Sequence, residues 1–98
     1  MPGLPVVFHP DAVDEAHAAR MWYAERSQSA ADSFLAELDL GIEFIADAPE
    51  RWPLFVNGTR RYLFHRFPFQ IVYRVMNDRV EVVAVAHGRR RPGYWKKR

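Results

Sequence analysis

The residues best suited to chemistry gather in one segment of the sequence, residues 86–98. It combines an imidazole, a run of arginines, two aromatic rings and further cations: His87, Arg89, Arg90, Arg91, Tyr94, Trp95 and Lys96–Arg98. An imidazole titrates near neutral pH, a guanidinium group binds phosphate or carboxylate through paired hydrogen bonds, and an aromatic ring stacks on a base. The segment therefore predicts contact with a phosphate-rich or acidic partner.

One chemistry that this segment could perform is the cleavage of RNA by attack of a 2′-hydroxyl group on its own phosphate. That reaction needs a base, a cation that stabilises the phosphate, and an acid for the leaving oxygen. His87, Arg89 and Tyr94 are the candidate catalytic residues only if the protein is a nuclease. The structural alternative stays open: His87 closes a strand by bonding a backbone carbonyl, while Tyr94 and Trp95 fold back over the sheet.

Composition and length limit the other functions. A chain of 98 residues predicts one domain, residues 1–98. It has no cysteine, which excludes a disulfide framework, thiolate catalysis and cysteine-based zinc sites. His9 and His17 have no carboxylate arrangement around them, so we expect no metal and no cofactor. The N-terminal residues 1–5 show no signal-peptide pattern and no apolar run reaches transmembrane length, so we expect a cytoplasmic protein without a membrane partner.

Charge is divided unevenly along the chain. Residues 1–50 hold two cations and ten acids, a net charge of −8, whereas residues 51–98 hold twelve cations and two acids, a net charge of +10. Such asymmetry is typical of a domain that displays one basic functional face.

The first half of the chain predicts a strand and two helices. Leu4–Phe8 is a short apolar strand candidate, and His9-Pro10-Asp11 then opens a helix. A second helix is predicted to begin at a capping box, Ser29–Asp32, and to end at Pro49. Both helices carry an apolar stripe, which indicates an antiparallel helical hairpin. The stripe residues are Ala12, Ala16, Ala19 and Tyr23 in the first helix and Ala31, Phe34, Leu35, Leu38, Ile42 and Ile45 in the second.

The second half predicts β-structure after a loop, Pro49–Gly58. Three runs rich in β-branched and aromatic residues, Arg60–Phe67, Phe69–Met76 and Arg79–His87, are joined by very short links and so predict an antiparallel meander. In the middle run Phe69, Ile71, Tyr73 and Val75 share the predicted core face. The expected fold class is α+β, with the helical hairpin over one face of a small antiparallel sheet whose other face is partly open and basic.

The order of these elements, together with several short motifs, resembles the RelE/ParE superfamily of bacterial type II toxins over nearly the whole chain. The motifs are Pro49-Glu50-Arg51-Trp52-Pro53, Arg60-Arg61-Tyr62, Phe69-Gln70-Ile71-Val72-Tyr73-Arg74-Val75 and His87-Gly88-Arg89-Arg90-Arg91. The resemblance implies a growth-arresting toxin that is silenced by a small cognate antitoxin with an acidic C-terminal segment. ParE-like members, which include plasmid stabilisation proteins, poison DNA gyrase. RelE-like members cut mRNA in the ribosomal A site.

Departures from the nuclease pattern favour the ParE-like interpretation. RelE-like nucleases typically have a lysine pair on the strand that corresponds to Arg60–Phe67 and an arginine early in the next strand. This chain has no lysine before Lys96, and Gln70 stands at the arginine position. The expected target-binding or antitoxin-binding residues are Arg61, His65, Arg66, Arg74, Arg89, Arg90, Arg91, Tyr94 and Trp95.

Three alternatives remain at this stage. One is a RelE-like nuclease that acts on the ribosome and mRNA. Another is a non-toxic relative or a basic nucleic-acid-binding module. A structural alternative holds that Arg61 and Arg74 pair with helix acids such as Glu37 or Glu43.

Overall fold

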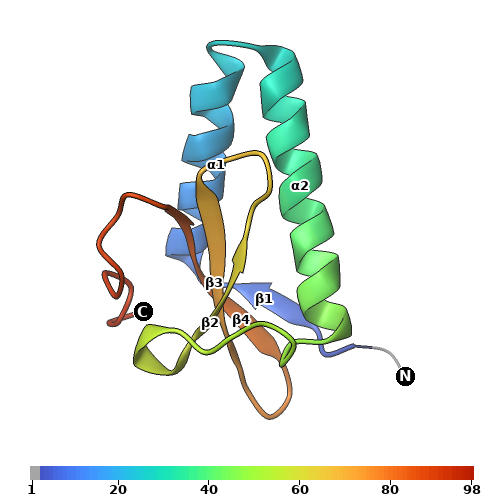
Figure 1. Cartoon of the computed structure of the whole chain (residues 1–98), viewed down its shortest axis with the longest axis vertical. Coiled ribbons are helices and arrows are strands. Elements are labelled where there is room, and N and C mark those ends of the chain that lie inside the picture. The colour runs from blue at the N-terminus through green and yellow to red at the C-terminus, as the bar shows by residue number, and fades with distance from the viewer. Residues whose placement is uncertain (1–2) are drawn as a thin grey trace.

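Two layers, a helical hairpin and a four-stranded sheet, make up residues 3–98, the part of the chain that the computed structural model describes (Figure 1). Met1 and Pro2, part of the segment without a signal-peptide pattern, lie outside the described residues. The elements in chain order are β1 (Val6–Phe8), α1 (Pro10–Ala24), α2 (Gln28–Asp47), β2 (Arg60–Leu63), β3 (Phe69–Val75) and β4 (Val80–His87). The predicted α+β order is confirmed.

The sheet has the strand order β1-β4-β3-β2. Strands β2, β3 and β4 form the predicted antiparallel meander. Strand β1 pairs parallel to β4, with Val6 opposite Val80 and Phe8 opposite Val82, so the four-stranded sheet is mixed and not simply the small antiparallel sheet that was expected. Parallel neighbours need a long crossover connection, and the helical hairpin between β1 and the meander supplies it.

Capping side chains fix where the two helices begin. His9 Nδ1 accepts a hydrogen bond from the backbone N–H of Asp11 at 3.1 Å, and Pro10 occupies the first helical turn, as predicted. The α2 cap is Ser27, whose Oγ accepts from the N–H of Ala30 at 3.2 Å. The predicted capping box at Ser29 is therefore wrong, because the extended backbone of Ser27 lets its hydroxyl cap the helix two residues earlier.

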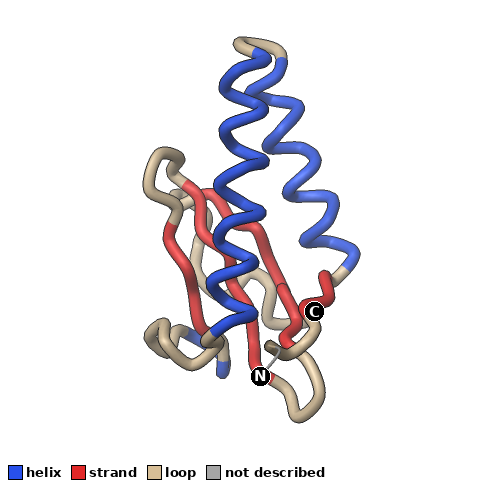
Figure 2. Tube along the Cα trace, turned by 90° about the vertical axis from the view of Figure 1, so that its right-hand side faces the viewer, coloured by secondary structure: helices blue, strands red, loops and turns tan. Residues whose placement is uncertain are grey.

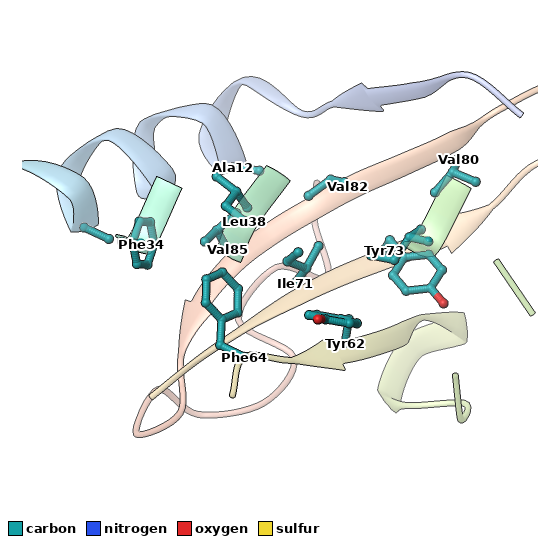
Figure 3. Close-up of a cluster of buried hydrophobic side chains, with 12 residues drawn as sticks. Ala12, Phe34, Leu38, Tyr62, Phe64, Ile71, Tyr73, Val80, Val82 and Val85 are labelled. Atoms are coloured by element: carbon teal, nitrogen blue, oxygen red, sulfur yellow. The ribbon is translucent and has the colours of Figure 1, made fainter. Parts of the chain in front are cut away.

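The hairpin covers one face of the sheet, and its tip extends beyond the strands in both views (Figures 1 and 2). The apolar stripes meet β3 and β4 in the core (Figure 3). Its central residues include Ala12, Phe34, Leu38, Ile45, Ile71 and Tyr73, as the periodicity predicted. Val82 and Val85 of β4, for which no core face was predicted, also belong to it. Val75 is the exception, because it ends β3 at the hairpin turn and stays partly exposed.

Gly41 lies where α2 approaches the sheet closely. A Cβ atom at this position would lie 2.9 Å from both Ile71 Cδ1 and Tyr62 Cε1. Gly41 is buried inside the helical stripe, where glycine lowers intrinsic helix stability by about 1 kcal/mol relative to alanine. The absence of a side chain at Gly41 lets α2 pack directly against the ring of Tyr62.

Strand β2 ends at Leu63, four residues before the predicted end of the run. Phe64 still donates a backbone hydrogen bond to Phe69 at 3.0 Å, but the chain then turns. A carboxylate oxygen of Glu37 accepts from the N–H of His65 and, at 3.0 Å, from that of Arg66. This side chain satisfies backbone donors that would otherwise continue a strand.

Candidate binding surface

The segment after β4 folds back and packs on the sheet face opposite the helices. In Figure 1 it runs out from β4 and then turns back. Trp95, only 2% exposed, joins a second apolar cluster with Val72, Val83, Ala84 and Ala86. The structural alternative for Tyr94 and Trp95 is therefore confirmed. Trp95 covers this face over β3 and β4, whereas Leu63 on β2 is 56% exposed, so the face is partly open, as expected.

Glu15 of α1 anchors this segment. Its carboxylate accepts hydrogen bonds from the hydroxyl of Tyr94 at 2.7 Å, from Arg98 Nη1 at 2.8 Å and from the N–H of Val85 at 3.0 Å. Arg98 Nη1 also donates to the carbonyl of Val83 at 2.9 Å. The side chains of Glu15 and Arg98 are 17% and 16% exposed, so the ion pair is largely withdrawn from solvent.

These contacts determine the chemistry of Tyr94. Burial raises the pKa of Tyr94 above its ordinary value of 10.0, and the hydrogen bond to Glu15 raises it further, against smaller opposing effects of Arg90 and Arg98. The phenol stays protonated, and its proton is directed at a carboxylate of its own chain. The group proposed as a general acid is therefore used in the fold.

His87 lies at the end of β4, as predicted, and its Nδ1 accepts a hydrogen bond from the N–H of Arg89 at 3.0 Å. The expected hydrogen bond to a backbone carbonyl is wrong, because the ring accepts from a backbone N–H. An Nδ1 that accepts leaves the proton of a neutral imidazole on Nε2. The ring also meets Phe69 edge-on, with centroids 5.1 Å apart.

A cavity of about 480 Å³ lies beside His87, between α1 and the start of β3. Its lining is mainly apolar or aromatic and includes Ala18, Ala19, Trp22, Tyr23, Pro68, Phe69 and Val85, and it also contains Glu15, His87 and Arg90. Tyr94 is not among the lining residues. The structure therefore brings His87 and Arg90 to one cavity but leaves Tyr94 directed elsewhere.

The sequence-predicted arginines on the strands are engaged with near neighbours. Arg61 donates to Gln70 Oε1 at 3.1 Å and lies over the ring of Phe55. Arg74 contacts Glu81 at 2.7 Å, because these two residues face each other across β3 and β4. The alternative in which Arg61 and Arg74 pair with Glu37 or Glu43 is therefore wrong. His65 and Arg66 are exposed at the turn after β2.

Five cations of the folded-back segment remain exposed. We call them the C-terminal basic surface: Arg89, Arg90, Arg91, Lys96 and Lys97. Within residues 3–98 none of the five has an acidic group within 4.0 Å. Arg90 lies over the ring of Tyr94, 3.9 Å from its centroid, which orients its guanidinium group. The surface is carried by a segment that Trp95 and Arg98 hold in place.

Sequence reasoning missed Glu15 and Arg98 as anchors. The sequence did contain a signal. Glu15 is next to Ala16, a residue of the apolar stripe of α1, and an acid beside a buried stripe needs a partner of its own. In the described part of the chain no three His, Asp or Glu side chains are grouped as metal ligands. None of the helices in residues 3–98 has the length and apolar character needed to cross a membrane.

Comparisons with known proteins agree with this architecture. Residues 6–92 match the family described as the ParE toxin of the type II toxin–antitoxin system parDE. A solved structure of the chromosomal ParDE toxin–antitoxin system from P. aeruginosa superposes with a TM-score of 0.75 and 15% identity, covering 86% of this chain and 95% of that one. No curated protein matches the sequence. On the family match, which spans nearly all of its length, the chain belongs to the ParE toxins of type II toxin–antitoxin systems.

Proposed function

We propose that this ParE toxin arrests growth by binding DNA gyrase through its C-terminal basic surface, without cutting nucleic acid. The observation that carries the proposal is the division of roles within residues 86–98. Tyr94 and Arg98 are bound to Glu15, whereas five neighbouring cations are exposed and have no acidic partner among the described residues. Fixed, unpaired cations suit electrostatic recognition of an acidic or phosphate-rich partner.

The same end of the molecule suits neutralisation by a cognate ParD-type antitoxin in the cytoplasm. The 480 Å³ cavity has apolar walls from Trp22, Tyr23 and Phe69, and Arg90 lies on its rim. An acidic antitoxin segment that folds on binding would place apolar side chains in the cavity and carboxylates against the arginines. Occupation of the cavity would also cover part of the basic surface, so antitoxin and target would exclude each other.

The test is a supercoiling assay with purified gyrase and the purified toxin. We expect loss of supercoiling and accumulation of cleaved DNA complexes. A triple variant, Arg89→Ala/Arg90→Ala/Arg91→Ala, should lose most of this effect, since rim charges govern the association rate. The matched control, Arg20→Ala/Arg51→Ala/Arg79→Ala, removes equal charge elsewhere and should inhibit like the wild type. Normal supercoiling by several gyrases in the presence of folded toxin would contradict the proposal.

One observation supports the alternative of a ribosome-dependent endoribonuclease. His87 and Arg90 line the same cavity, so a base and a phosphate-binding cation are available together. The missing part is an acid, because the Tyr94 proton is directed at Glu15. This alternative predicts cleavage of mRNA on translating ribosomes and a strict dependence on His87.

A further inference from the structure

Helix α2 has an exposed face on which acids alternate with large apolar side chains. We call Asp39, Leu40, Glu43 and Phe44 the acidic–apolar face. Leu40 is 44% exposed and Phe44 38%. Asp39 and Glu43 are exposed and form no ion pair within residues 3–98. The whole helix carries five acids and no lysine or arginine.

Acids at this end of the helix oppose its dipole, and of the two acids near the C-terminus only Asp47 has a cationic partner among the described residues, Arg51 at 3.5 Å. Negative charge is unfavourable near a helix C-terminus, where the backbone carbonyls already present partial negative charge. Asp47 lies in the last turn of α2, Glu43 lies one residue before that turn, and the last turn contains no basic residue. Local choices that oppose stability are expected at functional surfaces.

The face continues onto the edge of the sheet. The ring of Phe44 lies 6.5 Å from that of Trp52 and 6.3 Å from that of Tyr62, between centroids. Trp52 and Tyr62 line a second cavity, of about 300 Å³, together with Pro53, Arg61, Leu63 and His65. Leu63 is 56% exposed on β2, which is an edge strand. Apolar surface therefore extends from the end of α2, past Trp52, to the sheet edge.

Tyr62, labelled in Figure 3, adds a polar group beside this cavity. Tyr62 is only 3% exposed, and its hydroxyl has no hydrogen-bond partner among the described residues. A buried hydroxyl without a partner costs stability, so a partner chain that supplied an acceptor would gain binding energy from it.

We propose that the acidic–apolar face and the 300 Å³ cavity form a second docking surface, which takes a cationic amphipathic helix of a partner protein. Apolar side chains one turn apart on that helix contact Leu40 and Phe44 and reach toward Leu63. Lysine or arginine side chains flanking them meet Asp39 and Glu43. This inference does not depend on gyrase as the target, because it uses neither the basic surface nor the 480 Å³ cavity.

A second copy of the chain is a poorer occupant than a separate partner. Its surplus cations lie on residues 89–97, in a non-helical segment that Trp95 and Arg98 anchor to the sheet and to α1. Its two long helices offer only Arg20 as a cation, and Arg26, in the link between them, is stacked on Trp22. No element of the described chain combines helical structure with a cationic rim.

The test uses the ¹⁵N-labelled toxin and a synthetic amphipathic helix of leucine and lysine as the probe. We expect chemical-shift changes at Leu40, Phe44, Leu63 and the Trp52 indole, and none at Lys96 or Lys97. Two control peptides separate the causes: the same peptide with glutamate for lysine, and the leucine–lysine composition in scrambled order. Equal binding of either control, shifts centred elsewhere, or shifts that grow with toxin concentration in the absence of peptide would each overturn the proposal.

A charge-reversal pair sharpens the result. Asp39→Lys/Glu43→Lys should weaken binding of the leucine–lysine peptide about tenfold, since like charges across an interface are costly. The thermal midpoint of this variant should stay level or rise, because lysine near the C-terminus of a helix interacts favourably with the helix dipole. An unchanged or higher midpoint would show that weaker binding does not result from unfolding. The matched control Asp14→Lys/Glu25→Lys reverses two exposed acids of the α1 region and should bind like the wild type. Unchanged affinity in the first pair would contradict the proposed role of these acids.

Discussion

The hydroxyl of Tyr94 donates a hydrogen bond to Oε2 of Glu15 at 2.7 Å, across 79 positions of sequence. Arg98 approaches the same carboxylate with both terminal nitrogens, at 2.8 and 3.1 Å. The first helix and the last segment are therefore joined by one acid. The result is a basic surface whose position is set by the fold and not by a mobile arm.

Glu15→Ala should be among the most destabilising single substitutions. It leaves the guanidinium of Arg98, the phenol of Tyr94 and the N–H of Val85 without their acceptor, and breaking a buried ion pair costs about 3–5 kcal/mol. Urea unfolding followed by circular dichroism measures the loss. Asp14→Ala, at the exposed neighbouring acid, is the control and should change stability by less than about 0.5 kcal/mol. A similarly small loss in both variants would mean that the hydrogen bonds and ion pair of Glu15 contribute little to the free energy of unfolding.

Removing the candidate base and the candidate acid, two of the three candidate catalytic groups, should leave toxicity intact. His87→Ala/Tyr94→Phe deletes the imidazole and the phenolic proton but retains the Tyr94 ring that Arg90 stacks on. We expect growth arrest like that of the wild type on inducible expression, with replication affected before translation. Arrest that disappears in this variant while the purified protein stays folded would favour the nuclease mechanism instead.

Stability should fall at alkaline pH through tyrosine ionisation. Burial raises the pKa of Tyr73 to about 12, although nearby Arg60 lowers it somewhat, and burial also raises that of Tyr94. In the unfolded chain these phenols ionise near pH 10, so up to that pH their contribution is fully present. Between about pH 10 and 12 the unfolded state loses protons that the folded state keeps. Unfolding free energy then drops by up to about 1.4 kcal/mol per pH unit for each such tyrosine.

The check for this pH dependence is a series of urea titrations from pH 8 to 12. Tyr73→Phe should flatten the slope above about pH 10, at a constant loss of about 1 kcal/mol from its missing hydrogen bond to the carbonyl of Pro49. The same slope in wild type and variant would show that Tyr73 does not contribute.

Gly41→Ala should destabilise the protein although alanine is the better helix former. The new methyl group would clash with the Tyr62 ring and with Ile71 at 2.9 Å. Overpacking of this kind costs about 1–3 kcal/mol, against about 1 kcal/mol gained in helix propensity. Thermal unfolding measures the difference, and Ala36→Gly, at an exposed position of the same helix, reports the propensity effect alone. A higher thermal midpoint for Gly41→Ala would contradict this account of the close approach.

Local patterns in the sequence predicted the elements and their core faces well. Phe34 and Leu38 are spaced with the period of a helix, and Ile71 and Tyr73 with the period of a strand. Each pattern arises because one face of the element is buried against the opposite layer of the fold. The parallel pairing of Val6 with Val80 was not predictable in this way, because it depends on where the helical hairpin delivers the chain.

The candidate site was less predictable than the fold. Residue types showed that residues 86–98 are basic and aromatic, but not which of them are used within the molecule. Trp95 is buried and Arg98 is paired, whereas Arg89 and Lys96 are exposed, although all four belong to one short segment. The difference arises from Glu15, more than seventy positions away, and from an apolar patch on β3 and β4 that only the folded sheet presents.

The parallel partnership of β1 and β4 has a consequence for synthesis. Strand β1 is synthesised early, whereas the strand beside it and the residues that contact Glu15 are synthesised after both helices and the other two strands. Pairing of strands so distant in sequence is slow, and it cannot begin until both strands have been synthesised. A nascent chain therefore carries its helical hairpin long before it carries a finished sheet. The C-terminal basic surface can take its folded position only after residues 89–98 have been synthesised and Arg98 has reached Glu15.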